Sequence, residues 1–136
     1  MQGRNVADAS TNVSLALPNG AASTTSSAID LGNGTNGDFV APVEVHINAP
    51  LMGVTPMPDA KTMIYDLIHS VNSDLSSPAT LLAAVITQTG AGGAGCAAAE
   101  FRIPLPLGVR RYIGLKATGS GSGNATSSTA TIKLRY

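Results

Sequence analysis

The amino-acid sequence predicts an all-β fold, an antiparallel β-sandwich of the jelly-roll type. Short apolar segments alternate along the chain with clusters of Gly, Pro, Asn and Ser, which divide it into about eight strand-length pieces. Two of these pieces, residues 43–49 and 129–136, alternate apolar and polar side chains, as strands with one buried face do. Many short strands separated by turn residues are typical of sandwiches and barrels.

The length of the chain, 136 residues, is that of one domain. Such a domain buries a single core, roughly two-thirds of the surface that its unfolded chain exposes. Residues 1–12, MQGRNVADASTN, show no apolar period, so we expect a flexible N-terminal arm that orders against a neighbouring subunit. Arg4 in this arm is a candidate interface residue, and residues 13–136 are expected to form the sandwich domain.

The first part of the domain contains three predicted strands and a loop. Residues 13–17 and 27–31 are apolar segments with a Pro-Asn-Gly turn signal between them. In residues 43–49 the odd positions are apolar, so we expect the even positions, His46 among them, on a solvated face. Residues 52–60, MGVTPMPDA, contain two prolines, which lack a backbone donor, and should form a loop.

Residues 62–71 and 79–86 fit two interpretations. Apolar residues at helical spacing in the first segment would form a stripe on a helix, and Ser77-Pro78 could begin a second helix. The flanks are rich in Ser, Thr and Gly, and the rest of the chain has strand patterns. We therefore predict two strands joined near residues 72–74.

The last third of the chain is predicted to be strands and glycine-rich loops. Residues 119–124 hold three glycines between two strand patterns, as a hairpin loop would. The complete expectation is strands at 97–103, 109–117 and 128–136, and loops at 90–95, 104–108 and 119–124.

Residues 29–40, IDLGNGTNGDFV, contain the spacing G-x-G-x-x-G of dinucleotide-binding loops. Such a loop holds a phosphate because it follows a strand and opens a helix, whose free amides meet the anion. Here the chain continues into another strand pattern at residues 43–49. We therefore expect a connecting loop and no nucleotide cofactor.

No catalytic or metal-binding pattern stands out among the reactive side chains. The two histidines, His46 and His69, fit exposed or hydrogen-bonded positions on sheet faces, and no G-x-S-x-G pattern occurs. Cys96 is the only cysteine, which excludes an intrachain disulfide and a C-x-x-C zinc site. Asp30 and Asp38 flank the glycine loop without the ligand spacing of a calcium loop. We expect no enzyme, no cofactor and no metal.

Charge is sparse and unevenly distributed. Only 12% of residues are charged, so the surface is largely small neutral polar groups that suit packing against other proteins. The net charge is zero, and residues 101–136 hold six of the eight basic side chains and no acidic one. These cations are spread out without interleaved aromatics, which argues against nucleic acid. The sequence has neither a signal-peptide pattern nor an apolar run of about 20 residues, so we expect no membrane association.

Three segments carry a resemblance to a known family. They are ASTTSSAIDLG, DAKTMIYDLIHSVNSDLSSPATLL and LPLGVRRYIGLKATGSGSGNATSSTATIKLRY. From about Leu15 to Tyr136 the chain resembles the capsid decoration or cement proteins of tailed phages, of the type first described in a Bordetella phage. In that family the Pro-Leu-Gly-x-Arg-Arg-Tyr segment leads into the penultimate strand.

The resemblance implies a non-enzymatic β-sandwich on the outer surface of a virion assembled in the host cytoplasm. It would form a homotrimer and tie neighbouring major capsid subunits together. Two alternatives stay open: another virion component, such as a head fibre or tail protein, and a ligand- or carbohydrate-binding sandwich module. Aromatic residues, on which sugar rings are commonly stacked, make up only 4% of the chain.

The resemblance draws attention to Arg110, Arg111 and Tyr112 as candidate interface residues. In a strand over residues 109–117, Arg110 and Tyr112 would face one side and Arg111 the other. Both arginines then reach water only at a sheet edge or an interface. The alternative is a pair of charged residues that protects an edge strand from aggregation. Asp30 and Asp38 are candidates for a polar subunit contact.

Overall fold

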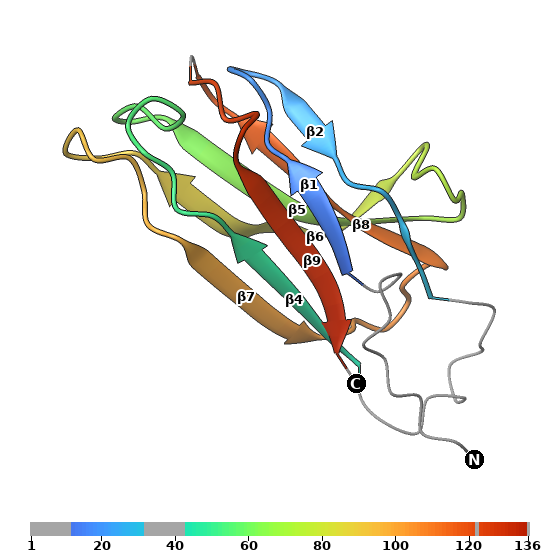
Figure 1. The fold of residues 1–136 in the computed structure, drawn as a ribbon. Coiled ribbons are helices and arrows are strands. Elements are labelled where there is room, and N and C mark those ends of the chain that lie inside the picture. The colour runs from blue at the N-terminus through green and yellow to red at the C-terminus, as the bar shows by residue number, and fades with distance from the viewer. Residues whose placement is uncertain (1–11, 32–42, 122, 136) are drawn as a thin grey trace.

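The structure, a computed structural model, describes residues 12–31, 43–121 and 123–135. These residues form two antiparallel β-sheets packed face to face (Figure 1). The prediction of an all-β sandwich is therefore confirmed. The described strands are β1 (Asn12–Ala16), β2 (Ser23–Thr25), β3 (Ile29–Asp30), β4 (Glu44–Ala49), β5 (Thr62–Ser70), β6 (Ala79–Thr89), β7 (Ala99–Pro104), β8 (Tyr112–Gly119) and β9 (Thr129–Arg135).

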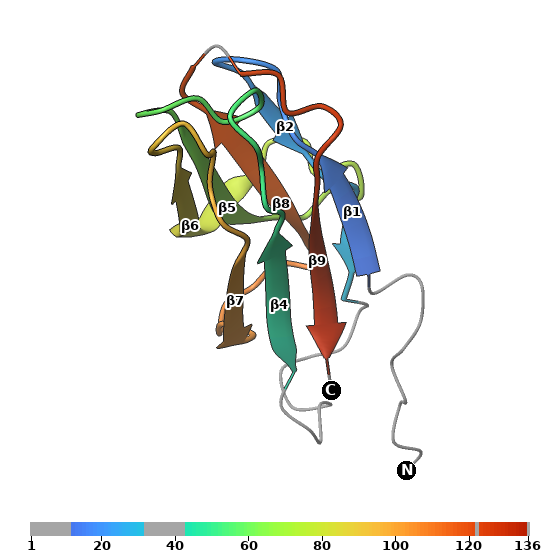
Figure 2. The same cartoon turned by 60° about the vertical axis from the view of Figure 1, so that its left-hand side comes forward.

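Most strands that follow one another in the sequence lie in different sheets. One sheet has the order β1-β9-β4-β7 and the other the order β2-β8-β5-β6, with β3 also paired to β8. Figure 2 shows the two layers side by side. Of the described strands, only β5 and β6 are consecutive in sequence and paired with each other. The β2–β3 and β5–β6 connections stay within one sheet, and each of the remaining connections carries the chain from one sheet to the other.

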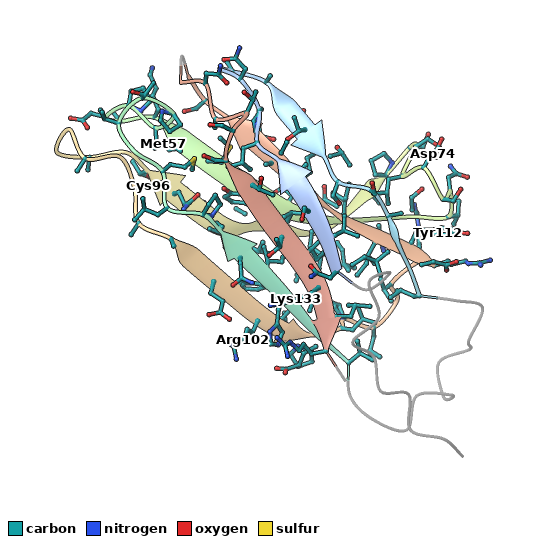
Figure 3. All side chains as sticks on the ribbon, viewed as in Figure 1. Met57, Asp74, Cys96, Arg102, Tyr112 and Lys133 are labelled. Atoms are coloured by element: carbon teal, nitrogen blue, oxygen red, sulfur yellow. The ribbon has the colours of Figure 1, made fainter. Side chains whose placement is uncertain are left out.

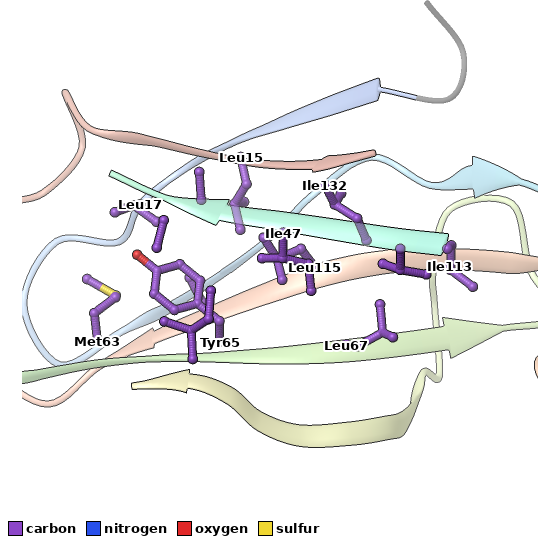
Figure 4. Close-up of a cluster of buried hydrophobic side chains, with 14 of the residues drawn as sticks. Leu15, Leu17, Ile47, Met63, Tyr65, Leu67, Ile113, Leu115 and Ile132 are labelled. Atoms are coloured by element: carbon purple, nitrogen blue, oxygen red, sulfur yellow. The ribbon is translucent and has the colours of Figure 1, made fainter. Parts of the chain in front are cut away.

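The core lies between the two sheets and is built by alternating side chains. Ile47 and Ile132 come from the four-stranded sheet, Tyr65 and Leu115 come from the other, and all four are fully buried (Figure 4). Burying one such aliphatic side chain stabilises a fold by about 1.5–3 kcal/mol. The alternation predicted for residues 43–49 is therefore the pattern that positions β4 in the core.

Residues 62–71 and 79–86 are strands, and the helical interpretation is wrong. The helix-like spacing in β5 arises because apolar residues lie on both of its faces. Ile68 points away from the core, yet it is only 2% exposed. The loop at residues 71–78 inserts Leu75 on this outer face, above Gly114 of the adjoining strand β8. A strand that is covered on both faces loses strict alternation.

The glycine-rich segment 119–124 is not a hairpin loop. It leaves β8 in the five-stranded sheet and leads to β9 in the other sheet, so it crosses one end of the sandwich. There the amide of Gly20 donates to the carbonyl of Gly123 (2.7 Å), and Asn19 forms an isolated bridge with Asn124. Gly and Asn residues indicate that the chain turns, but they do not indicate which sheet the next strand joins.

Several strands differ from the expected ones. Strand β2 is not among the predicted strands, because its Ser-Thr-Thr segment has no apolar residue; it is held by pairing with β8. Strand β7 is Ala99–Pro104 in place of 97–103, and β8 begins at Tyr112 in place of residue 109. The expected loops over residues 52–60 and 90–95 contain no strand.

His46 is on the predicted outer face of β4 but is buried, with 5% exposure. In the sheet register it pairs with Lys133 of β9 on one side and with Arg102 of β7 on the other; Figure 3 labels these two neighbours. The aliphatic stems of such side chains cover their neighbours. The expectation of a fully solvated face is therefore wrong at this position, because β4 is an interior strand.

Candidate interaction surface

Four of the six predicted interface residues lie together at one end of the five-stranded sheet. Here β3 and β5 end and β8 begins, on the right in Figure 1. We call this surface the arginine end and define it by Asp30, His69, Val71, Leu107, Arg110, Arg111 and Tyr112. The other two candidates, Arg4 and Asp38, lie outside the described residues, as do residues 1–11 of the expected N-terminal arm and residues 32–37, for which the sequence predicts a connecting loop.

Arg111 and Asp30 form a two-point ion pair across β8 and β3. The guanidinium Nε donates to Oδ1 (2.8 Å) and Nη2 donates to Oδ2 (2.9 Å). The backbone aligns the pair, because Asp30 is in register with Tyr112 and the amide of Leu31 donates to the carbonyl of Arg111 (2.8 Å). This geometry matches the planar fork of a guanidinium to a carboxylate, and the hydrogen bond to Asp30 raises the pKa of Arg111.

The guanidinium of Arg111 also lies over the ring of Tyr112. Its Cζ is 5.1 Å from the ring centroid, within the range of a cation–π contact. A carboxylate and an aromatic face thus hold the same side chain. The expected loss of rotamer freedom on binding is smaller for a side chain that is already held in this way.

The two arginines precede β8 and do not follow its alternation. Strand β8 also has a partner on each side, β3 and β5, so these arginines do not protect an edge strand. The backbone amide of Arg110 instead donates to Nδ1 of His69 at 3.1 Å. This bond ties the connection between β7 and β8 to the end of β5. The Arg110 side chain is exposed.

His69 faces inward, opposite Ile113 of β8 and Ala79 of β6. Its side chain is buried (8% exposed). Burial and then the positive charge of Arg110 lower the pKa of His69. The imidazole therefore stays neutral at pH 7, with Nδ1 as the acceptor and the remaining proton on Nε2.

His69 and Ser70 do not form a catalytic pair, although they are adjacent in sequence. Successive residues of a strand point to opposite faces. The hydroxyl of Ser70 donates to the carbonyl of Ser76 at 2.8 Å, on the face opposite His69. Within the described parts of the chain, no group of three or more His, Cys, Asp and Glu side chains is placed to hold a metal ion.

Exposed apolar side chains adjoin the arginines. Leu107 is 92% exposed, on the loop that leads to Arg110, and Val71 is 67% exposed. Val71 follows Ser70, which pairs with Tyr112. A surface that combines large exposed apolar groups with guanidinium and tyrosine side chains has the composition of the centre of a protein–protein interface.

Sequence reasoning had no signal for His69 as part of this surface. Its contact with Arg110 spans 41 residues, and the Arg111–Asp30 pair spans 81. Both contacts depend on the pairing of β8 with β5 on one side and β3 on the other. The available sequence signal for Leu107 is an apolar residue inside the predicted loop at residues 104–108, shortly before the Arg-Arg-Tyr segment.

No protein-family model, curated protein or solved structure matches this chain. Among the residues that the structure covers, there is no helix of the length and hydropathy needed to cross a membrane.

Proposed function

We propose that this chain is a virion structural protein: a capsid decoration protein that binds the outside of a phage head as a homotrimer. In this role it ties neighbouring major capsid subunits together. The observation that carries the proposal is the order of strands in the two sheets, which we infer to be that of a jelly roll. Jelly rolls are a common architecture of viral capsid domains.

The jelly-roll assignment rests on how the chain moves between the sheets. Strands β2 and β3 both pair with the same side of β8, so together they occupy one strand position. The orders β1-β9-β4-β7 and β2/β3-β8-β5-β6 then place four positions in each sheet. The final strand lies beside the first one, and the chain crosses between the sheets at nearly every connection, as two Greek keys require.

The surface and the sequence support the same function. The resemblance to phage cement proteins covers the chain from about Leu15 to its end. Many copies of a modest contact hold a shell together because all of them must break before a capsomer leaves. The arginine end offers such a contact, since it combines exposed Leu107 with charged neighbours.

A carbohydrate-binding module is the second candidate, because lectin domains also use jelly rolls. The described aromatic side chains favour protein contacts instead. Tyr65 is fully buried, Phe101 is half-buried, and Tyr112 is covered on one face by Arg111. Saturation-transfer NMR with a panel of neutral oligosaccharides separates the two: a specific sugar signal favours the module, and its absence favours the capsid protein.

Electron microscopy of the virion that carries this gene tests the proposal directly. We expect density for the sandwich on the outer head surface, at three-fold or quasi-three-fold positions. Density only on a fibre or the tail would assign the chain to that component, and no density on the particle would refute a structural role. Light scattering on the purified chain tests the trimer, which a monomer at high concentration would contradict.

A further inference from the structure

We infer that the arginine end is the surface that docks on the capsid, and that it takes an acidic protein segment with an apolar residue beside its carboxylate. The inference rests on the proposed function, because the partner is a protein of the same virion. Three features of the surface carry it: an available guanidinium, exposed apolar side chains and a backbone held by specific contacts.

The available guanidinium is that of Arg110. Its backbone amide is engaged by His69, but within the described ranges its side chain has no carboxylate partner. Its neighbour Arg111 binds Asp30 at two points. One positive charge at this end is thus balanced inside the chain, and the other is left to attract a carboxylate from outside.

Leu107 and Val71 supply the apolar part of the surface. They are two of the large apolar side chains that the structure leaves exposed. Leu107 is on the β7–β8 connection, which also carries Arg110, and Val71 is on the β5–β6 connection beside it. Burying an exposed Leu side chain against a partner favours binding, because apolar surface is removed from water. A partner that covers Leu107 therefore needs an apolar group next to the carboxylate that meets Arg110.

The backbone at the two arginines is held by specific contacts. The bond from the Arg110 amide to His69 fixes one end of the connection, and the Arg111–Asp30 fork fixes the residue that follows. Prior fixation reduces the entropy that docking must remove. The backbone that presents Arg110 is therefore already positioned before the partner arrives.

The chemistry favours a protein segment over nucleic acid. A nucleic acid backbone offers a phosphate at every nucleotide and is held by several cations at once. At the arginine end the Asp30 carboxylate neutralises one of the two adjacent arginines, and Leu107 offers nothing to a phosphate. A single carboxylate next to an apolar side chain matches both groups.

The test is binding of the full-length protein to heads of the phage that carries this gene, purified and freed of their decoration protein. We expect Arg110→Gln and Leu107→Ser each to weaken binding about tenfold, as truncation of one of the minority of strongly contributing interface residues does, and Arg110→Lys to restore part of it. Raising NaCl from about 50 to 500 mM should weaken the wild type more than Arg110→Gln, because salt screens the charge contact.

Two matched variants serve as controls. Arg102→Gln removes a guanidinium from the outer face of the four-stranded sheet, and Leu51→Ser removes a leucine that is 70% exposed. Leu51 comes just after Ala49, the last residue of β4. Leu107 comes just after Pro104, the last residue of β7, which pairs with Glu44, the first residue of β4. The two leucines therefore lie at opposite ends of the sandwich, and neither control should change the affinity.

The outcomes separate the proposed docking surface from the proposed capsid role. Binding by the wild type that Arg110→Gln and Leu107→Ser leave unchanged overturns the docking surface but keeps the capsid role. Failure of the wild type to bind the heads overturns both. Binding of the wild type to a DNA duplex that Arg110→Gln abolishes would assign this end to nucleic acid and overturn the acidic-segment partner. Thermal melting of each variant should match the wild type, because the substituted side chains are exposed.

Discussion

The backbone amide of Arg110 donates a hydrogen bond to Nδ1 of His69 over 3.1 Å, and so joins the β7–β8 connection to the end of β5. The acceptor is available only while that nitrogen carries no proton. The position of the arginine end therefore depends on a neutral histidine.

Acid should destabilise the protein through His69. Burial and then Arg110 lower its pKa from the ordinary 6.5, so below pH 6.5 the unfolded chain takes up a proton before the folded one does. The free energy of unfolding then decreases as the pH falls, until the folded form also titrates. Urea denaturation between about pH 8 and 5.5, where carboxylates stay ionised, should show this slope for the wild type.

The histidine variant gives the control for this pH effect. His69→Asn keeps an acceptor near the Arg110 amide but does not titrate, so part of the slope should disappear. NMR titration of the wild type should give a His69 midpoint below 6.5, and the Arg110 amide signal should shift with the same midpoint. A midpoint at or above 6.5 would contradict the expected sign.

The Arg111–Asp30 fork should add little stability but should fix the geometry of the arginine end. Both side chains are partly exposed, at 39% and 46%, and water and salt weaken such pairs. We expect Arg111→Gln and Asp30→Asn to lower the melting temperature only slightly, with a coupling in the double variant that shrinks in 1 M NaCl. A coupling that does not respond to salt would show that the contact is not chiefly electrostatic.

Gln88 should be the costliest polar side chain to remove. Its amide accepts a hydrogen bond from the Tyr65 hydroxyl and donates to the carbonyls of Pro50 and Ala97, each at 2.8 Å. Gln88→Leu would leave the buried Tyr65 hydroxyl and two part-buried carbonyls without this partner, and we expect a loss of about 1–3 kcal/mol in the free energy of unfolding by urea denaturation. Thr87→Ala, on the exposed face next to it, is the control and should cost well under 1 kcal/mol.

Gly114 should tolerate no side chain while Leu75 covers it. A Cβ at Gly114 would collide with Cδ1 of Leu75, which is 4% exposed, so we expect Gly114→Ala to cost about 1–3 kcal/mol. Leu75→Ala removes the nearest obstacle, although Ser26 Oγ at 3.1 Å remains, and the double variant should lose less than the sum of the two single ones. Gly53→Ala, where a Cβ meets nothing within 4 Å, is the matched control. Additive losses would show that the two residues do not compete for this space.

Much of the fold could be predicted because β4 and β9 repeat the period of a strand with one buried face. The same reasoning chose strands for residues 62–71 and 79–86, although apolar residues on both faces of β5 imitate a helix. It failed for β2, whose Ser-Thr-Thr segment is a strand only because β8 offers it hydrogen bonds. Strand propensity is a property of one segment, whereas strand pairing also depends on the segment that lies beside it.

The residues of the candidate site could be predicted from the sequence in part, but their contacts could not. The Arg-Arg-Tyr segment and Asp30 stood out in the sequence, but nothing in their spacing linked them. The distance of 81 residues between Arg111 and Asp30 closes only because β3 pairs with the first residues of β8. The role of His69 required the neighbouring pairing of β5 with β8.

The sequence by itself determined that the chain forms short strands with one apolar face and turns between them, because side-chain period and turn chemistry act over a few residues. Only the tertiary structure decided which strands share a sheet and that residues 119–124 cross the sandwich. It also brought Arg111 to Asp30 and Arg110 to His69. These contacts come from backbone hydrogen bonds and core packing between distant segments, and such bonds depend on the whole arrangement of strands more than on any one segment.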